Sequence, residues 1–440
     1  MNNTPQNMDV SSVRLRRPER MQMTMQTQCV DDLIPPDHQV RVIWQVVDAM
    51  DLSPFLVFTK AREGVGGRDT TDPRLLVCLW LHATLRGIGS ARQLARQCVD
   101  NAPFRWLCGG VSINHHTLSD FRVQHEAALD DLFTRTIATL VDKGLVSVQR
   151  IAQDGTRVRA SAGAGSFRRQ ERLEKLLAEA REHVTQVKAL MDDPAQAAAL
   201  SARQKAARQR AAQEREERVR QAIEQLPELE QRQAERAKTV SKKDKAAGKI
   251  KEPRASTTDP DTRVMKMGDG GFRPALNMQF AADTASRAIV GVEVLNVGVD
   301  SGQAEPMRQQ VERRTGRTVG EHLVDGGYLT FDEIDRAAEQ DVKLYVPPKP
   351  PRNPAQCGDA SAPRPGDSEA VKQWRQHMSS EEAKSIYKQR AATIETINAD
   401  AKTHRGLGRL LVRGVEKAKC VALWFALAYN LMHFGSQMIA

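Results

Sequence analysis

The amino-acid sequence predicts a mixed α/β protein with a helical unit at its N-terminus and a long helical insertion within the α/β part. Apolar residues recur with helical spacing over much of residues 31–140, whereas β-branched runs alternate with helical stretches after residue 264. Charge-rich helical sequence with few aromatic residues separates the first predicted strand from the others. The length of 440 residues accommodates this organisation, since roughly two to four folding units are expected at such a size.

The composition is that of a folded, basic protein, with 40% hydrophobic residues, 27% charged residues and a formal net charge of +10. A positive surplus favours a polyanionic partner such as nucleic acid, although a generic basic surface gives the same charge. No apolar run reaches about 18 residues and no apolar signal core begins the chain, so we expect neither a membrane span nor export. The six cysteines form no Cys-x-x-Cys pair, which fits free thiols in a reducing cytoplasm.

The N-terminal region divides into a polar arm, residues 1–30, and a helical unit, residues 31–140. One helical stripe in that unit is made of Val40, Ile43, Val46, Val47 and Met50. Four arginines lie between its apolar positions: Arg92, Arg96, Arg105 and Arg122. These residues fit a helical DNA-binding domain and, equally, a plain helical bundle with solvated arginines.

The α/β part is expected in residues 141–163 and 264–440. A first strand is predicted at 145–154 and ends in Asp154; later strands are predicted at 275–284, 287–298, 322–328 and 342–347. A helix, 331–340, separates the last two strands. A Pro-rich exposed loop is predicted at 348–380, and the last sixty residues read as helical.

The insertion, residues 164–263, is predicted to be a helical hairpin or coiled coil with a basic linker. Its heptad seam consists of Leu173, Leu177, Ala180, Val184, Val187 and Met191. Pro194 is expected to break the first helix and Pro227 the second, and residues 241–256 form the linker. Its charges suit a solvated helix face, so a spacer or a self-association arm would explain the segment.

Three carboxylates are candidates for metal chemistry. Asp154 and Asp325 each end a predicted strand and precede glycine, and ligands gather at such strand ends in open α/β sheets. Glu395 lies on a helix that could cross that edge. Two Mg²⁺ ions about 3.5–4 Å apart would offset three converging acids and could activate and stabilise the oxygens of a phosphodiester. Taken singly, each aspartate is more often a turn residue.

A set of spaced residues surrounds Glu395 on the predicted helix. Glu395 and Lys402 are seven residues apart, which places them on one helical face. Tyr387 and Arg390 precede them, and positive charge follows at Lys402, Arg405, Arg409 and Arg413. A basic run beside a metal-binding acid suits a DNA phosphate, whereas the alternative is an amphipathic helix with solvated basic side chains.

These motifs resemble DDE-type transposases of bacterial insertion sequences, specifically the group with a coiled-coil insertion in the catalytic domain. The resemblance lies in AQDGTRVRASAG around Asp154, VDGGYLT around Asp325, and YKQRAATIETINADAK around Glu395. The tyrosine–arginine–glutamate–lysine signature of that family is matched by Tyr387, Arg390, Glu395 and Lys402. One extra residue separates Arg390 from Glu395, and Asn398 stands where relatives often carry an aromatic residue. The helical stretch DPRLLVCLWLHATLRGIGSARQLARQC resembles the family's N-terminal domain.

The resemblance implies an RNase H-like catalytic core, with Asp154, Asp325 and Glu395 as catalytic and metal-binding residues. It also implies two Mg²⁺ ions, for which Mn²⁺ could substitute, and cleavage and strand transfer at the ends of the element. The expected DNA-contacting residues are Tyr387, Arg390, Lys402, Arg405, Arg409 and Arg413. The partners would be terminal inverted repeats, target DNA and a second copy of the chain, in a bacterial cytoplasm near the nucleoid.

Two other functions remain open from the sequence. The chain could be an inactive DNA-binding descendant of a transposase, or an RNase H-like nuclease that cuts without joining. Three further acids are not expected to bind metal: Asp269 lies in a Gly-rich turn, Asp283 could shape the site, and Asp400 points to another helix face.

Overall fold

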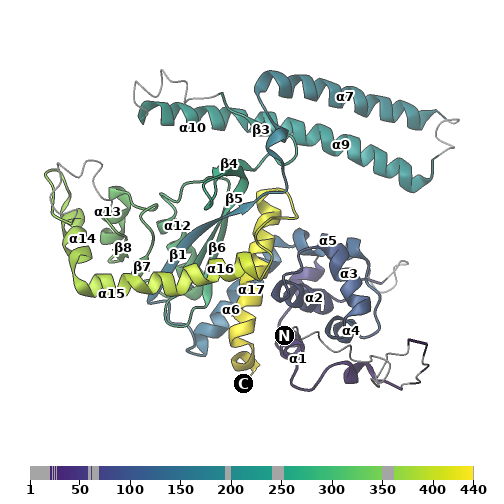
Figure 1. Cartoon of the computed structure of the whole chain (residues 1–440), viewed down its shortest axis with the longest axis horizontal. Helices are drawn as coiled ribbons and strands as arrows, with labels where there is room; N and C mark the ends of the chain where they lie inside the picture. The colour runs from purple at the N-terminus through teal and green to yellow at the C-terminus, as the bar shows by residue number, and fades with distance from the viewer. Residues whose placement is uncertain are drawn as a thin grey trace, which may run out of the picture.

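The computed structural model describes residues 20, 21, 23, 25, 27–57, 61, 69–193, 200–239, 252–348 and 361–439. The predictions for most of the N-terminal arm, for residues 241–251 of the basic linker and for residues 349–360 of the Pro-rich loop therefore lie outside the described residues. Figure 1 shows a sheet at the centre, helices of the N-terminal region beside it, and a long helical hairpin at one end.

The N-terminal region is helical, as predicted. Its helices are α1 (Gln39–Asp48), α2 (Pro73–Leu85), α3 (Ala91–Asp100), α4 (Ala102–Cys108), α5 (His115–Gln124) and α6 (Glu126–Asp142), with short 3₁₀ turns at Val30–Leu33 and Ser53–Leu56. The side chain of Asp72 accepts the Arg74 N–H and Pro73 takes the first turn of α2, which is a favourable helix start. Nearly all of α2 is buried, so this helix forms the centre of the region.

The central sheet is mixed. Its strands are β1 (Arg150–Arg159), β4 (Arg263–Lys266), β5 (Phe272–Asp283), β6 (Ile289–Leu295), β7 (Glu321–Leu323) and β8 (Lys343–Tyr345). They run in the order β4-β5-β1-β7-β8, and β6 pairs with β5. β5 is antiparallel to β1, β4 and β6, whereas β1, β7 and β8 are parallel neighbours. Two helices interleave with the later strands: α12 (Ala304–Thr315) and α13 (Phe331–Glu339).

The first strand differs from its predicted position. It begins at Arg150 and runs to Arg159, so Asp154 lies inside the strand instead of at its end. Residues 145–149 have strand-like composition but form an irregular connection, in which Val148 has φ 51° and donates its N–H to the carboxylate of Asp283. The strand continues through Gly155 because β5 pairs with it from Ile151 to Arg159.

Other elements also depart from the predictions. β4 and α12 were not predicted, and α14 (Glu369–Ser379) lies where an exposed loop was expected. The side chain of Ser368 caps α14, and the buried ion pair between Arg375 and Asp367, at 2.8 Å, anchors it. The helix therefore forms through capping and tertiary contacts that the Pro-rich composition did not indicate.

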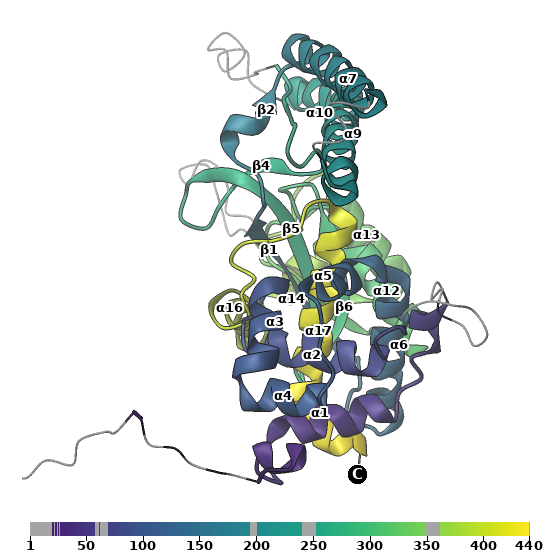
Figure 2. The same cartoon turned by 90° about the vertical axis from the view of Figure 1, so that its right-hand side faces the viewer.

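The insertion forms a hairpin with its own small core, at the top of Figures 1 and 2. Helices α7 (Gln170–Asp192) and α9 (Ala202–Glu224) pack together, and α10 (Leu226–Thr239) follows. The small core contains Leu173, Val219, Ala222 and Leu226. Along the predicted seam, Leu173 and Ala180 are buried and the other members are half-buried. Short strands β2 (Phe167–Arg168) and β3 (Ala255–Ser256) pair at its neck.

The C-terminal region is helical. It contains α15 (Glu381–Arg390), a π-helical turn (Ala391–Glu395), α16 (Thr396–Thr403) and α17 (Val415–Ile439). The long helix α17 is buried over most of its length and packs against β6 as well as against α2 and α6. α17 therefore joins the N-terminal helices to the sheet. Within the described parts of the chain, no helix has the length and apolar character needed to cross a bilayer.

Candidate active site

Strand pairing brings Asp154 and Asp325 close together. β1 and β7 are parallel neighbours with Ala152 opposite Leu323, and each aspartate lies two residues beyond its member of that pair. Both side chains are therefore expected on the same face of the sheet, at the level where β7 ends and β1 continues. Their negative charges interact, because Asp325 raises the pKa of Asp154.

A single guanidinium connects the first and third predicted acids. Arg390, at the end of α15, lies 3.1 Å from Oδ1 of Asp154 and donates to Oε1 of Glu395 at 2.7 Å. The amide of Asn398, on α16, donates to Oδ2 of Asp154 at 3.0 Å. The Arg390 side chain is 9% exposed, that of Asp154 19%, and that of Glu395 52%. The buried guanidinium of Arg390 therefore lies between two carboxylates, and that of Glu395 is half-exposed to solvent.

The charge state of Asp154 reflects this environment. Burial raises the pKa of Asp154 to about 6, Arg390 opposes that rise, and Asp325 adds to it. Burial acts to lower the pKa of Arg390, but Asp154 and its other anionic neighbours raise it overall. Near neutral pH the site therefore holds an ionised Asp154 against a charged Arg390.

The extra residue between Arg390 and Glu395 has a structural explanation. Residues Ala391–Glu395 form a π-helical turn, which accommodates one more residue than an α-helical turn. Arg390 and Glu395 are five positions apart, yet their side chains meet on one face. Helix α16 then continues in the phase that directs Asn398 to Asp154. The π turn thus brings Glu395 onto the same face as Arg390 over a spacing of five residues.

The oxygen-only donor set suits a hard divalent cation in its chemistry. In the described residues, however, no three His, Cys, Asp or Glu side chains already surround a common point closely enough to hold an ion. The guanidinium of Arg390 lies between Asp154 and Glu395 and forms an ion pair with each, so this position stabilises a positive charge. Cation binding would therefore require Arg390 to withdraw and the half-exposed Glu395 to turn inward. The carboxylates themselves offer the oxygen ligands that such an ion prefers.

The basic residues around Glu395 fall into two groups. Lys402, Arg409 and Arg413 are exposed. Burial lowers the pKa of Lys402 while Asp154 opposes that shift, so its ammonium lies near the acids. Arg405 is engaged within the protein: it binds Asp400 at 2.9 Å, the Leu85 carbonyl and the sulfur of Met432. Tyr387 is half-buried beside Arg390.

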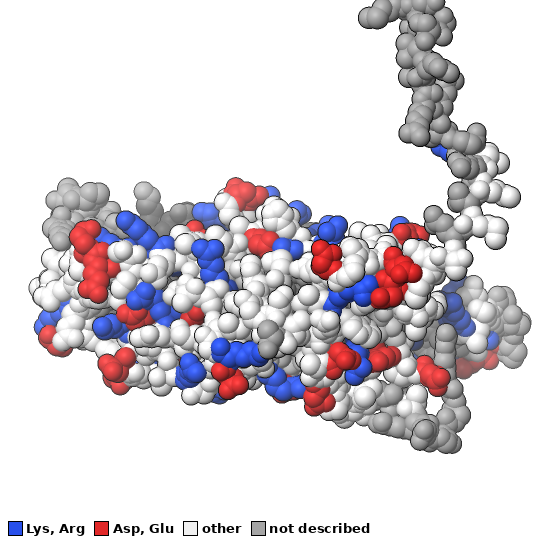
Figure 3. Space-filling view, turned by 90° about the horizontal axis from the view of Figure 1, so that it is seen from below, with Lys and Arg blue, Asp and Glu red and all other residues white. Residues whose placement is uncertain are grey.

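The arginines of the N-terminal helices also differ from one another. Arg92, Arg96 and Arg105 are exposed, whereas Arg122 lies over the Trp80 ring at 4.7 Å and donates to the Gly89 carbonyl at 2.5 Å. Arg122 thus has a packing role. Figure 3 shows basic and acidic side chains interspersed on one face of the molecule, without a continuous basic band there.

A fourth carboxylate, Asp300, was not identified from the sequence. It lies between β6 and α12, and its Oδ1 accepts from the amides of Asn277 at 2.8 Å and Gln279 at 2.7 Å. The charge of Asp300 acts on Asp154 and on Tyr328. Asp300 lies two residues beyond the predicted strand 287–298 and is followed by serine, so the rule that selected Asp154 and Asp325, a strand end directly before glycine, did not select it.

The remaining acids have partners in turns and helices. Asp269 pairs with Arg273 at 2.7 Å in an exposed turn. Buried Asp283 accepts the N–H groups of Val148 and Ser286. Asp400 pairs with Arg405. These contacts account for each carboxylate without a metal.

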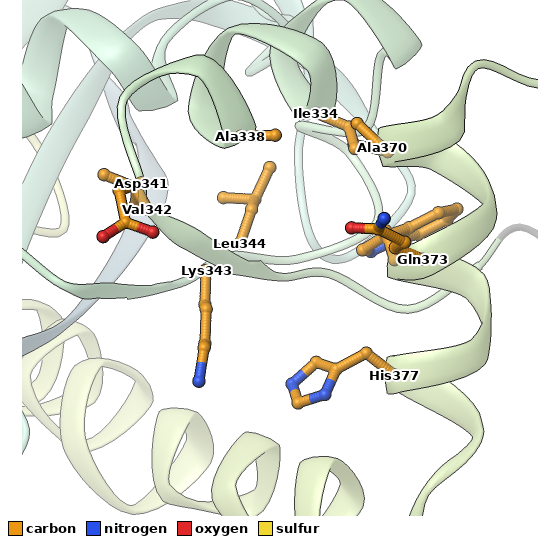
Figure 4. A pocket seen from close by; sticks show the side chains of 10 residues that line it. Ile334, Ala338, Asp341, Val342, Lys343, Leu344, Ala370, Gln373 and His377 are labelled. Atoms are coloured by element: carbon orange, nitrogen blue, oxygen red, sulfur yellow. The ribbon is translucent and has the colours of Figure 1, made fainter.

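A separate pocket of about 300 Å³ lies beside β8, α13 and α14. Figure 4 shows Ile334, Leu344 and His377 around it, with Lys343 at its edge. None of the predicted site residues lines this pocket, so it does not belong to the carboxylate site.

Two family models match the chain. A "Transposase domain (DUF772)" model matches residues 28–124, and a "Transposase DDE domain" model matches residues 361–434. No curated protein and no solved structure matches. The first match covers α1 to α5, and the second contains Arg390, Glu395 and Lys402. Together they support a DDE-type transposase of the insertion-sequence type.

Proposed function

We propose that the protein cleaves DNA at the ends of an insertion sequence and joins those ends to target DNA, with an RNase H-like core formed by residues 141–163 and 264–440. The proposal is supported above all by Arg390, a buried cation shared by Asp154 and Glu395 beside Asp325. Carboxylates from three distant segments converge on one positive charge there. Such convergence is what a site for divalent cations on DNA requires.

Asp154, Asp325 and Glu395 would hold two Mg²⁺ ions, or Mn²⁺ in their place. When bound, these ions supply Lewis-acid stabilisation of the attacking and leaving oxygens of the phosphodiester. In the first reaction a water oxygen bonds to phosphorus and the bond to the 3′-oxygen breaks, which leaves a 3′-hydroxyl. In the second reaction that hydroxyl attacks a phosphate of the target, loses its proton and displaces the target's own 3′-oxygen.

The side chains of the chain itself have separate tasks in this proposal. Arg390 leaves Asp154 when a cation binds and then contacts the scissile phosphate, since guanidinium groups recognise phosphate bidentately. Tyr387 positions Arg390, and Lys402 stabilises the phosphate charge near Asp154. Exposed Arg409 and Arg413 contact the DNA backbone farther along. Arg405 holds the 404–414 segment against α2, through its bond to the Leu85 carbonyl.

The other regions would recognise and pair the DNA ends. The helices of residues 31–140 would bind the terminal inverted repeats, with exposed Arg92, Arg96 and Arg105 as phosphate contacts. A homodimer would bring two ends together. The helical hairpin, residues 164–263, would then act as a spacer or self-association arm.

A strand-transfer assay on element-end DNA with Mg²⁺ tests this proposal. Asp154→Asn, Asp325→Asn and Glu395→Gln should each lower cleavage and joining by about a thousandfold or more, because each removes a charge that stabilises the cations. Asp269→Asn, in an exposed turn, is the matched control and should retain activity. Full activity of Asp154→Asn would refute the assignment. Cleavage without joining would instead support a nuclease, and DNA binding without nicking in any divalent cation an inactive descendant.

A further inference from the structure

Asp300 is built into a polar cradle on the sheet. Its Oδ1 accepts two hydrogen bonds, from Asn277 and Gln279 of β5, and its side chain is 12% exposed. The amide of Gln279 is oriented in turn, because its Oε1 accepts from Gln153 at 3.0 Å and from the Tyr328 hydroxyl. The position of the Asp300 carboxylate is therefore determined by the sheet and not by solvent.

The second oxygen of Asp300 faces the same small space as Asp325. A Cβ on Gly327 would lie 2.8 Å from Oδ1 of Asp325 and 3.7 Å from Oδ2 of Asp300. On the other side, a Cβ on Gly155 would lie against Oδ1 of Asp300 and 2.8 Å from Oδ1 of Asn277. Only glycine fits at positions 155 and 327, because the polar side chains around Asp300 and Asp325 already occupy the space that a Cβ would take.

A buried acceptor without a partner lies beside Asp300. Asn277 is fully buried, its Nδ2 donates to Asp300, and its Oδ1 has no hydrogen-bond partner in the structure. Rotating the amide would place this oxygen against the carboxylate, so the observed orientation is the favourable one. A buried oxygen of this kind requires a donor, and the waters that Mg²⁺ retains are donors.

The ordinary alternative is that Asp300 serves only as a partner for Arg157. However, Nη2 of Arg157 lies 3.7 Å from Oδ2 of Asp300, whereas it donates to the Gly298 carbonyl at 2.7 Å. Arg157 therefore binds the Gly298 carbonyl more closely than Oδ2 of Asp300, although its Nε has no hydrogen-bond partner. An ion pair of that length does not explain two amide donors and two adjacent glycines.

We propose that Asp300 is a fourth carboxylate of the divalent-cation site, and that its Oδ2 binds the cation, or a water held by that cation, next to Asp325. The proposal rests on the proposed function, because it assumes that Asp154 and Asp325 bind divalent cations. It adds Asp300 to the site and assigns Asn277 the task of accepting from a cation-bound water. Gly155 and Gly327 then allow the backbone to approach these polar side chains closely.

Binding of Mn²⁺ to the full-length protein without DNA, measured by electron paramagnetic resonance, tests the assignment. Asp300→Asn keeps the shape of the side chain but removes its charge, and it should weaken Mn²⁺ binding about tenfold or more, the range seen when groups around a metal are altered. Asp269→Asn should bind as the unaltered protein does. If Asp154→Asn and Asp325→Asn lose binding while a folded Asp300→Asn does not, this inference fails and the proposed function stands. If none of these variants changes binding, both fail.

A second measurement on the unaltered protein does not depend on how Asp300→Asn folds. Fe²⁺ placed in a Mg²⁺ site reduces added hydrogen peroxide to hydroxide and a hydroxyl radical, which cuts the nearby backbone, and added ascorbate reduces the resulting Fe³⁺ back to Fe²⁺. Cuts near residues 154, 300 and 325 that are suppressed by excess Mg²⁺ would support the proposal. Cuts near 154 and 325 without any near 300 would overturn it.

Discussion

Arg390 balances the charge of the candidate site in the metal-free protein. Its 9% exposed guanidinium pairs with Asp154, whose carboxylate is itself mostly buried. Arg390→Ala would leave that carboxylate without its partner, and losing one member of a buried pair costs on the order of 3 kcal/mol. Because a divalent cation would supply the missing charge, Mg²⁺ should recover most of the lost stability. Urea denaturation with and without Mg²⁺ measures both effects.

The matched control for Arg390→Ala is the buried pair between Arg375 and Asp367. Its members are 3% and 6% exposed and lie in α14 and the segment before it. Arg375→Ala should also destabilise the protein, but Mg²⁺ should not restore its stability, because this pair is apart from the proposed cation site. Equal recovery of the two variants would show that Mg²⁺ acts generally and not through Asp154.

His322 should make the protein sensitive to acid. The side chain is completely buried in β7, neither ring nitrogen has a partner, and burial lowers its pKa to about 3, with help from the charge of Arg308. In the unfolded chain His322 has the ordinary histidine pKa, so below about pH 6.5 its ring is protonated, whereas in the folded protein it stays neutral. Stability should therefore fall by about 1.4 kcal/mol per pH unit as the pH decreases from there toward 3.

His322→Leu tests that origin of the acid sensitivity. The variant should be close to the unaltered protein in stability at pH 7, since it removes two unpaired nitrogens from an apolar site. Between pH 6 and pH 4.5, the free energy of unfolding of the variant should fall less steeply with decreasing pH, because unfolding takes up one proton fewer. His82, whose pKa burial lowers to about 4, will keep part of the slope. Exposed His404→Leu should change nothing, and an unaltered slope in His322→Leu would contradict the prediction.

At the scale of elements, local patterns predicted helices better than strand boundaries. The periodic segments of α1, α7 and α17 formed where expected, because burial of one face or of the whole helix dictated them. The boundary of β1 was wrong because Gly155 resembles a strand end, whereas antiparallel pairing with β5 continues through it. The proximity of Asp300 to Asp325 depends on where the turn after β6 meets the sheet, and no local pattern contains that information.

The π turn at Ala391–Glu395 makes a prediction about the helix that carries Glu395. A π turn of this kind contains one residue more than the helix needs, so deleting exposed Ala392 should leave α15 and α16 in phase. Arg390 and Glu395 would become an i, i+4 pair and remain on one face. The deletion variant should fold, melt near the unaltered protein and keep cleavage activity within about tenfold.

Deleting exposed Ala399 from α16 is the control for the Ala392 deletion. There the helix has no extra residue, so the deletion rotates every later position by about 100° and turns Ala401 out of its buried place. This variant should lose stability and activity together. If both deletions are equally harmful, the π turn is required for the fold instead of absorbing a surplus residue.

At the scale of the whole molecule, α17 determines which parts unfold together. The helix packs on β6 and on α2 and α6, so the sheet and the N-terminal helices share one hydrophobic core. Trp424 of α17 donates to the Arg122 carbonyl at 3.0 Å, and the buried Arg314 of α12 pairs with Asp130 of α6. The hairpin of α7 and α9 has a separate small core. Two cooperative units are therefore expected, with the site inside the larger one.

Replacing Asn430 tests whether the sheet and the N-terminal helices unfold as one unit. This fully buried side chain accepts from the Ile289 N–H at 2.9 Å and donates to the Ile289 carbonyl at 2.8 Å. Asn430→Ala leaves both groups unpaired, which should cost about 2–4 kcal/mol because each buried unsatisfied group costs roughly 1–3 kcal/mol. Hydrogen exchange followed by mass spectrometry should then show protection falling together in β6 and α2, with α7 and α9 unchanged. Exposed Ser436→Ala is the control on α17. A loss of protection confined to β6 would mean that the N-terminal helices are a separate unit, positioned against the central sheet without sharing its stability.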